Sequence, residues 1–258
     1  MDSVSRPLQG RVALVTGGSR NIGRCAALAL GRAGADVVVT YRERAQAAAE
    51  VVGELQALGV RAEAVQADLS VSAAVEPLVS ALRRTLVAWD REGLDVLVNN
   101  AGTMRLATFD QVTEADLDAN YQLNFKGVFL LTQALMPVLR DGGRIVNLGS
   151  GTARIAFAPL VSYGPQKAAL HSLTLYLAAF FGPRGITVNA IAPGGLDDDF
   201  NAPLFARMPA AHEFIRSHTA VGRVGVPSDV GDVIAFLCSP QAAFVSGAVL
   251  PVDGGYHL

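Results

Sequence analysis

The sequence is poor in cysteine, and its two cysteines suggest neither a disulfide nor a metal site. Cys25 and Cys238 both lie in apolar helical patterns, and no C-x-x-C pair or histidine cluster accompanies them. We interpret both as small buried side chains, which fits a reducing compartment. We therefore expect no bound metal and no disulfide framework.

Long apolar runs are also missing. No stretch reaches the length of a membrane span, and residues 1–7 lack the apolar core of a signal peptide. An excess of either charge is absent too, because 21 basic and 23 acidic residues are interspersed and leave a net charge of −2. These absences predict a cytoplasmic protein with no nucleic-acid or membrane partner.

A large apolar content is present in a regular arrangement. Hydrophobic residues make up 51% of the 258 positions, which supports a large core and argues against disorder. Expected strands lie at 12–16, 36–42, 61–66, 94–98, 143–148, 186–192 and 248–252. Expected helices lie between them at 24–33, 44–58, 71–89, 113–140, 163–182 and 227–238, while 196–220 looks irregular. This alternation, without repeats or linkers, predicts one continuous α/β unit.

A glycine-rich turn joins the first expected strand to the first expected helix. Gly17 permits a tight turn, and Gly23 permits close packing of the helix on the strand. Strand, glycine-rich turn and helix form the context in which backbone N–H groups bind a pyrophosphate at a helix N-terminus. A plain strand-to-helix connection is the alternative.

The end of the second expected strand bears on cofactor choice, because a dinucleotide's adenosine ribose lies there. An acidic residue would mark NAD, but the sequence has Tyr41 and Arg42, with Arg20 in the glycine turn. Two guanidinium groups suit a 2′-phosphate, so we predict NADP(H), with NAD(H) the less favoured alternative. Arg42 would otherwise begin a solvated helix. Further along, Asp68 either accepts from adenine or caps the next helix.

Four polar side chains are candidates for acid–base chemistry. Tyr163 and Lys167 are four positions apart and share one face if the segment is helical. A nearby ammonium favours the phenolate, which would lower the tyrosine's pKa from its usual value of about 10. Ser150, after the fifth expected strand, can polarise a carbonyl oxygen. Asn124 interrupts an apolar helical pattern and should have a specific polar partner.

With these residues in view, the chain resembles the short-chain dehydrogenase/reductase family from about Leu8 to Tyr256. The family's T-G-x-x-x-G-x-G turn stands at 16–23, with Asn21 in place of the middle glycine. Its N-N-A-G segment is 99–102 and its P-G turn is 193–194. The resemblance implies a single Rossmann-type domain over residues 1–258, with a doubly wound parallel seven-stranded sheet and helices on both faces. It also implies a homotetramer.

The resemblance further implies an active-site tetrad of Asn124, Ser150, Tyr163 and Lys167. NADPH would supply hydride to a carbonyl, Tyr163 would donate the proton, and Ser150 would hydrogen-bond the same oxygen. Lys167 would hold the nicotinamide ribose and lower the tyrosine's pKa, and Asn124 would anchor a water linked to Lys167. The predicted cofactor contacts are Gly17, Ser19, Arg20, Asn21, Ile22, Gly23, Tyr41, Arg42, Asp68, Leu69, Asn99, Ala101, Gly102, Tyr163, Lys167, Pro193 and Gly194.

One departure from the family follows the P-G turn. Where members commonly have a threonine that contacts the nicotinamide carboxamide, this chain has Asp198, within an Asp197-Asp198-Asp199 run. Asp198 can still accept from the carboxamide NH₂. Three consecutive acids cannot all point one way, which weighs against a metal site.

The apolar residues of 151–162 and 200–214 suggest a hydrophobic or acyl-type ketone or alcohol as substrate, under a mobile lid at about 196–220. Candidate substrate contacts are Gly151, Ile155, Phe157, Gly195, Phe200 and Leu204. The chain looks similar to a 3-oxoacyl carrier protein reductase or a broad carbonyl reductase. The alternatives are an NAD-dependent alcohol or sugar dehydrogenase acting oxidatively, and a non-catalytic NADP-binding regulator.

Overall fold

The computed structural model describes residues 6–258, so most of the N-terminal segment considered for a signal peptide lies outside it. Seven parallel strands form one sheet in the order β3-β2-β1-β4-β5-β6-β7. Their bounds are β1 Val12–Val15, β2 Asp36–Tyr41, β3 Ala62–Gln66, β4 Leu94–Asn99, β5 Leu139–Leu148, β6 Thr187–Pro193 and β7 Val249–Val252. The predicted doubly wound parallel sheet is confirmed.

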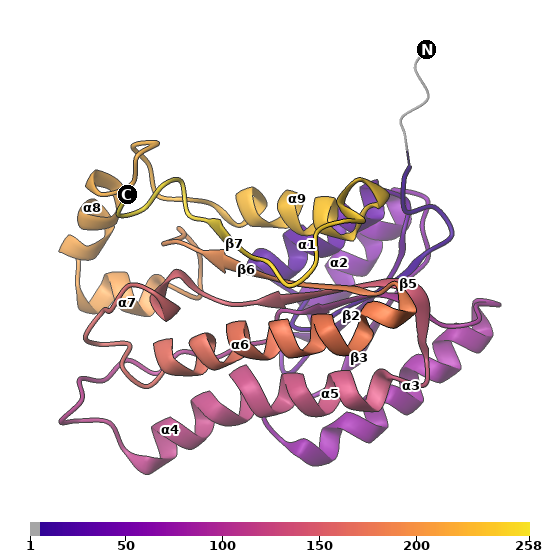
Figure 1. Ribbon diagram of the computed structural model, residues 1–258, viewed down its shortest axis with the longest axis horizontal. Helices are drawn as coiled ribbons and strands as arrows, with labels where there is room; N and C mark the ends of the chain where they lie inside the picture. The colour runs from indigo at the N-terminus through magenta and orange to yellow at the C-terminus, as the bar shows by residue number, and fades with distance from the viewer. Residues whose placement is uncertain (1–5) are drawn as a thin grey trace.

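Helices cover both faces of the sheet (Figure 1). On one face lie α1 (Asn21–Arg32), α2 (Ala45–Ala57) and α9 (Pro227–Cys238), and on the other lie α3 (Val75–Ala88), α5 (Gly127–Leu135) and α6 (Gly164–Phe181). The first strand shows why its sequence is continuously apolar. Ala13 and Val15 pack into the first cluster, whereas Val12 and Leu14 pack into the second. Within residues 6–258, no helix has the length and apolarity needed to cross a membrane.

The region predicted as one helix over 113–140 is broken into three parts. It consists of α4 (Glu114–Tyr121), a π-helical turn η2 (Gln122–Lys126) and α5, and β5 already begins at Leu139. Thr113 and Asp116 form a capping box at the start of α4, with Asp116 N donating to Thr113 Oγ1 at 3.2 Å. Single-turn π segments are rare and often mark functional sites, and this one contains Asn124.

The expectation that 196–220 is irregular was wrong. This segment contains two short helices, α7 (Ala202–Arg207) and α8 (Ala210–Ser217). Helices of six and eight residues give too few repeats for a periodicity to stand out. Single turns of 3₁₀ helix complete the fold: η1 Ser72–Ala74, η3 Gly151–Ala153, η4 Gly182–Arg184 and η5 Pro240–Ala242.

The strand order brings several loops to one edge of the sheet. From β1 the chain builds outward through β2 and β3, then returns to place β4 on the other side of β1. The loops after β1 and β4 therefore diverge to opposite faces and leave a crevice between them, which is where open α/β sheets bind ligands. The helices α7 and α8 lie beyond this edge, at the left of Figure 1.

Candidate active site

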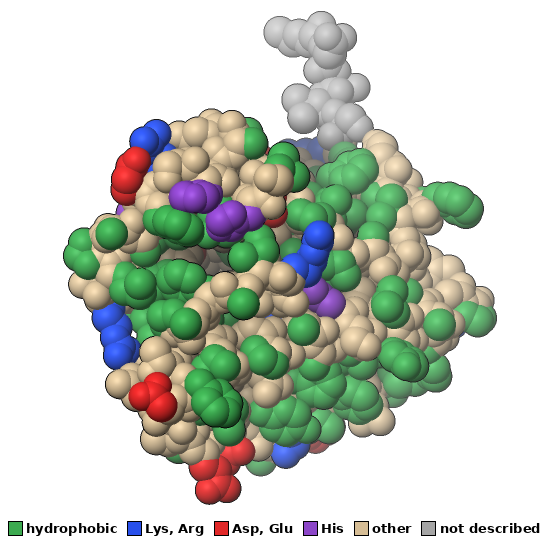
Figure 2. All heavy atoms as spheres, turned by 60° about the vertical axis from the view of Figure 1, so that its left-hand side comes forward, with side chains coloured by type: hydrophobic (Ala, Val, Ile, Leu, Met, Phe, Trp, Pro, Cys, Tyr) green, Lys and Arg blue, Asp and Glu red, His purple; other side chains and the backbone are tan. Residues whose placement is uncertain are grey.

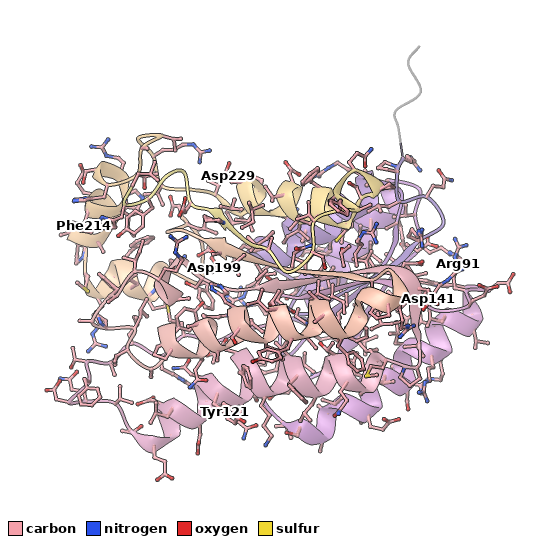
Figure 3. The ribbon with its side chains drawn as sticks, viewed as in Figure 1. Arg91, Tyr121, Asp141, Asp199, Phe214 and Asp229 are labelled. Carbon is pink, nitrogen blue, oxygen red and sulfur yellow. The ribbon has the colours of Figure 1, made fainter. Side chains whose placement is uncertain are left out.

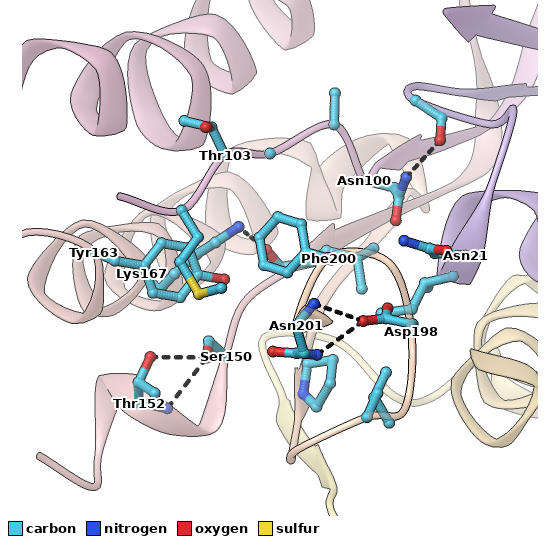
Figure 4. A pocket seen from close by; sticks show the side chains of 18 of the residues that line it. Asn21, Asn100, Thr103, Ser150, Thr152, Tyr163, Lys167, Asp198, Phe200 and Asn201 are labelled. Carbon is cyan, nitrogen blue, oxygen red and sulfur yellow. Dashed lines mark hydrogen bonds between the residues drawn. The ribbon is translucent and has the colours of Figure 1, made fainter. Parts of the chain in front are cut away.

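A cavity of about 720 Å³ lies at the carboxyl ends of the strands. Figure 2 shows this face hollowed, with hydrophobic and histidine side chains gathered around the hollow. Every predicted cofactor and substrate contact except Asn99 lines it, and so do Ser150, Tyr163 and Lys167 (Figure 4). The structure thus brings together residues from six separate parts of the sequence.

The glycine turn accommodates Asn21 at the position where the family has its middle glycine. Asn21 adopts a φ of 49°, in the left-handed region where glycine is usual and asparagine is among the better tolerated residues. A Cβ on Gly23 would lie 2.3 Å from the Gly17 carbonyl oxygen, so only glycine fits where α1 meets the turn. The first turn of α1 begins at Asn21 beside this cradle, and the N–H groups of a first helical turn have no partner within their helix.

A set of hydrogen bonds joins this turn to the residues that follow β4. Asn100 Nδ2 donates to the carbonyl oxygens of Thr16 at 2.8 Å and Gly17 at 3.1 Å. Thr16 Oγ1 in turn accepts from the backbone N–H groups of Asn100 and Ala101. Asn100 lines the cavity and was missed from the sequence.

Asn99 is a correction, because its side chain does not reach the cavity. It is 2% exposed, and its Nδ2 donates to Asn147 Oδ1 at 2.9 Å and to Thr132 Oγ1 at 3.2 Å. It ties β4 to β5. Successive residues at the end of a strand point to opposite sides, so only one of the pair can face the ligand.

Tyr163 and Lys167 lie at the start of α6, and Ser150 lies at the end of β5. All three side chains are buried, with exposed fractions of 6%, 4% and 9%. Lys167 Nζ donates to the Leu148 carbonyl oxygen at 2.6 Å and lies 5.7 Å from the centre of the Tyr163 ring. Ser150 Oγ lies 2.8 Å from Thr152 Oγ1 and accepts from the Thr152 N–H.

The pKa of Tyr163 is raised, whereas the sequence led us to expect that it is lowered. Burial raises the pKa of Tyr163 far above its usual value, and this outweighs a hydrogen bond from Ser150 that lowers it. The negative charge of Asp198 raises the pKa of Tyr163 further. Burial also lowers the pKa of Lys167 to about 8. Tyr163 is therefore a protonated phenol at neutral pH, which suits a proton donor.

Asn124 is completely buried in the π turn and has the polar partner that its position demanded. Its Oδ1 accepts from Thr103 N at 3.1 Å, and its Nδ2 donates to Thr103 O at 2.8 Å. A Cβ on Gly102 would lie 3.0 Å from Asn124 Oδ1 and 3.7 Å from Lys167 Nζ. Asn124 therefore lies behind the cavity wall, near Lys167, with the small Gly102 between them.

The arginines near the second strand differ from the predicted pair. Arg42 forms an ion pair with the neighbouring Glu43 at 2.8 Å. Arg44, which the sequence did not single out, lies beside Arg20, and both contact Asp199 Oδ2, at 3.3 and 3.5 Å. All three arginines line the cavity. Arg44 therefore lies together with the two arginines that the sequence singled out, at the end of β2.

Asp68 lies at the adenosine end of the same cavity. Its Oδ1 accepts from the N–H of Ser70 at 3.0 Å and from the Ser70 hydroxyl at 2.6 Å. This local turn replaces the helix cap that was one of its two expected roles, because η1 begins only at Ser72. Asp68 and Leu69 both line the cavity wall.

The three consecutive acids diverge as predicted. Asp197 Oδ2 lies 3.9 Å from His212 Nε2, Asp198 Oδ1 accepts from Asn201 N and Nδ2 at 2.9 and 3.0 Å, and Asp199 contacts the arginines. Only Asp198 points into the cavity (Figure 4). Burial raises the pKa of Asp198.

The part of the cavity next to α7 and α8 is rich in aromatic rings. Phe200 lies against Tyr163, with ring centres 6.3 Å apart. Leu160, Ala211 and Phe214 come from the apolar ranges that the sequence indicated, whereas Met104, Leu123, Ile215, Tyr256 and His257 are lining residues that it did not reveal. The last two reach the site because the C-terminal tail pairs with the end of α8, through a bridge between Thr219 and Tyr256. Such a long-range pairing leaves no local signal in the sequence.

A doubly wound sheet with a glycine cradle, paired arginines and a buried tyrosine–lysine–serine group defines a dinucleotide-dependent oxidoreductase. A family model described as enoyl-(acyl carrier protein) reductase matches residues 17–257. The chain belongs to the short-chain dehydrogenase/reductase family.

Similar proteins cover nearly the whole chain. The hydroxynaphthalene reductase-like protein Arp2 of Metarhizium brunneum is 37% identical over 98% of this chain and 97% of its own length. The angucycline C-6 ketoreductase LanV, solved with bound NADP, is 40% identical over 97% of both chains, with a TM-score of 0.92. A short-chain dehydrogenase from Burkholderia cenocepacia, in complex with NADP, is 41% identical over 98% of this chain and 100% of its own, with a TM-score of 0.88.

Proposed function

We propose that this protein is an NADP(H)-dependent ketoreductase that reduces a ring ketone on a hydroxylated aromatic substrate. The observation that carries this proposal is the position of Tyr163. Its protonated phenol lies where the cofactor half of the cavity meets the aromatic substrate half. Hydride transfer to a carbonyl at that boundary would place the developing alkoxide beside a proton donor.

The residues present fit the cofactor. The Asn21 and Gly23 cradle is open to a pyrophosphate, and Arg20, Arg42 and Arg44 supply positive charge for a 2′-phosphate. When bound, NADPH supplies the hydride. Lys167 lies one turn below Tyr163 and would hold the nicotinamide ribose, while Asn124 would relay protons to it through water, as the family resemblance implies.

The substrate class follows from the shape and chemistry of the outer cavity. Phe157, Phe200, Phe214 and Tyr256 surround it, and flat rings gain most by packing against other rings. The named activities of Arp2 and LanV, on hydroxynaphthalene and angucycline compounds, support the same class. A 3-oxoacyl substrate is the second candidate, because the same wall is apolar enough for an acyl chain.

We further propose that residues 196–220 act as a lid and that the enzyme is a cytoplasmic homotetramer. Exposed apolar side chains on the outer helices support the tetramer, since large apolar patches usually mark interfaces. They are Leu117, Tyr121, Phe129, Leu175, Tyr176 and Phe180. Light scattering should give four times the chain mass of 26.9 kDa, and a monomer would contradict the assembly.

The proposed activity is tested by following NADPH and NADH oxidation with a panel of carbonyl compounds. The panel contains hydroxylated tetralones, simple cyclic ketones and an acetoacetyl thioester, with sugar alcohols and NADP⁺ for the reverse direction. We expect kcat/KM for the tetralones to exceed that for the thioester by about 10-fold or more. Preference for the thioester would favour a 3-oxoacyl reductase. Faster oxidation of the sugar alcohols, with NAD⁺ assayed beside NADP⁺, would favour an NAD-dependent dehydrogenase, and no turnover would favour a non-catalytic regulator.

A further inference from the structure

An acidic side chain of the proposed lid contacts two arginines that line the cavity. Asp199 Oδ2 lies 3.5 Å from Arg20 Nη1 and 3.3 Å from Arg44 Nη1 (Asp199 is labelled in Figure 3). Arg20 belongs to the glycine turn after β1, and Arg44 directly precedes α2. One carboxylate oxygen therefore bridges two loops that are separated from it by more than half of the chain.

Arg20 and Arg44 are also two of the guanidinium groups that we propose bind the 2′-phosphate of the cofactor. Arg42 has its own partner in Glu43, whereas Arg20 and Arg44 share a single acid. A phosphate monoester carries a charge of about −1.5 to −2 near neutral pH. It would be repelled by a carboxylate held between the same two cations, since like charges at this distance disfavour each other.

We propose that Asp199 and the 2′-phosphate of NADP(H) compete for the Arg20–Arg44 pair. Asp199 is then a specificity-determining residue that weakens binding of the phosphorylated cofactor, and Arg44 is a phosphate-binding residue. A cofactor without the phosphate leaves the Asp199 bridge in place, whereas one with the phosphate releases it and frees the start of the lid. The inference rests on the proposed use of NADP(H), but not on the substrate.

Binding of two nucleotides tests the competition without involving substrate or nicotinamide. 2′,5′-ADP and 5′-AMP differ only in the 2′-phosphate, and calorimetry gives a Kd for each. In Asp199→Asn we expect 2′,5′-ADP to bind about 3- to 10-fold more tightly and 5′-AMP to change by less than about 2-fold, because exposed ion pairs are individually weak. Asp197→Asn is the matched control, since it removes the same charge two residues away without an arginine contact.

A double-mutant cycle assigns the effect to the arginine pair. Arg44→Gln should weaken 2′,5′-ADP by about 10-fold and should reduce the gain produced by Asp199→Asn. An Asp199→Asn gain that is absent, or that is equalled by Asp197→Asn, would overturn the competition. Unchanged 2′,5′-ADP binding in Arg44→Gln would remove Arg44 from the site.

The wild-type protein separates this inference from the proposed function. If it binds 2′,5′-ADP no better than 5′-AMP, the proposed NADP(H) preference itself fails. If it prefers 2′,5′-ADP and Asp199→Asn leaves that preference unchanged, the cofactor proposal stands and the competition fails. Hydrogen exchange over residues 197–201 adds a second readout: 2′,5′-ADP should speed exchange there in the wild type relative to 5′-AMP, and Asp199→Asn should abolish this difference.

Discussion

At the scale of single residues, Tyr163 decides whether the chain can do reductase chemistry. Its burial keeps the phenol protonated, and its ring lies between Lys167 and Phe200. Tyr163→Phe removes only the hydroxyl, so we expect kcat to fall by about 10²- to 10⁴-fold. NADPH binding, measured by its fluorescence, should change little. Retention of most of the activity would show that another group donates the proton.

Lys167 predicts the pH dependence of the reduction. Its pKa is lowered by burial to about 8, so the ammonium is present below that pH and is lost as the pH rises through it. Loss of this charge removes stabilisation from the developing anion, and we expect kcat to be level below pH 8 and to decline above it. Tyr163 cannot produce this break, because its pKa is shifted upward. A level profile to pH 10 would contradict the assignment.

Residue types and spacing predicted most of the cavity wall, but not which of two neighbours faces it. Asn99 and Asn100 are identical in type, and only the pleat of β4 distinguishes the one that ties strands from the one that lines the site. The pKa of Tyr163 was predicted in the wrong direction for a different reason. Sequence places the ammonium one turn away, but it does not reveal how completely the phenol is buried, and burial is the main cause of the raised pKa.

At the scale of elements, the π turn between α4 and α5 was hidden inside a longer helical pattern. Its effect is to hold Asn124 against the Thr103 backbone. Asn124→Leu keeps the volume but leaves the Thr103 N–H and carbonyl unpaired, so we expect a loss of about 1–3 kcal/mol in the free energy of unfolding. Urea denaturation measures it. Gln122→Leu, in the same turn and partly exposed, should cost less than about 0.5 kcal/mol.

Strands and long helices were predictable because each buries one continuous or periodic apolar set. The helices α7 and α8 were not predictable, because they are short and contact distant loops. Arg207 Nη1, for example, donates to the Leu106 carbonyl oxygen at 2.8 Å. The pairing of Thr219 with Tyr256 is of the same kind. Such contacts depend on the assembled fold, and local sequence carries no trace of them.

At the scale of the whole molecule, ion pairs connect the amino end of β2 to the loops that precede β3 and β4. This edge of the sheet lies opposite the edge that carries the candidate active site. Asp36 accepts from Arg61 at 2.6 Å and from Arg91 at 3.0 Å. Burial raises the pKa of Asp36, but the hydrogen bonds from Arg61 and Arg91 outweigh it and leave the pKa below its usual range. The carboxylate therefore stabilises the fold above its ordinary pKa, and this stability is lost as the pH falls through the lowered value.

Replacement of the Asp36 carboxylate should show how much it contributes to the free energy of unfolding. We expect Asp36→Asn to lower the free energy of unfolding by about 1–3 kcal/mol at pH 7, because two arginines lose a charged acceptor. The difference between variant and wild type should shrink as the pH falls through the acidic range. Urea denaturation at several pH values measures both quantities. A difference that stays constant with pH would show that shape rather than charge is responsible.

β1 is an interior strand of the sheet, and its two neighbouring strands are synthesised at different times. Val15 pairs with Val39 on one side and with Val98 on the other, so its second neighbour is made much later. At about 5–20 residues per second, a ribosome leaves this apolar strand with one open edge for several seconds. The first βαβ unit therefore keeps an unpaired strand edge until β4 has been synthesised. We expect chaperones to bind mainly those nascent chains that end before Val98.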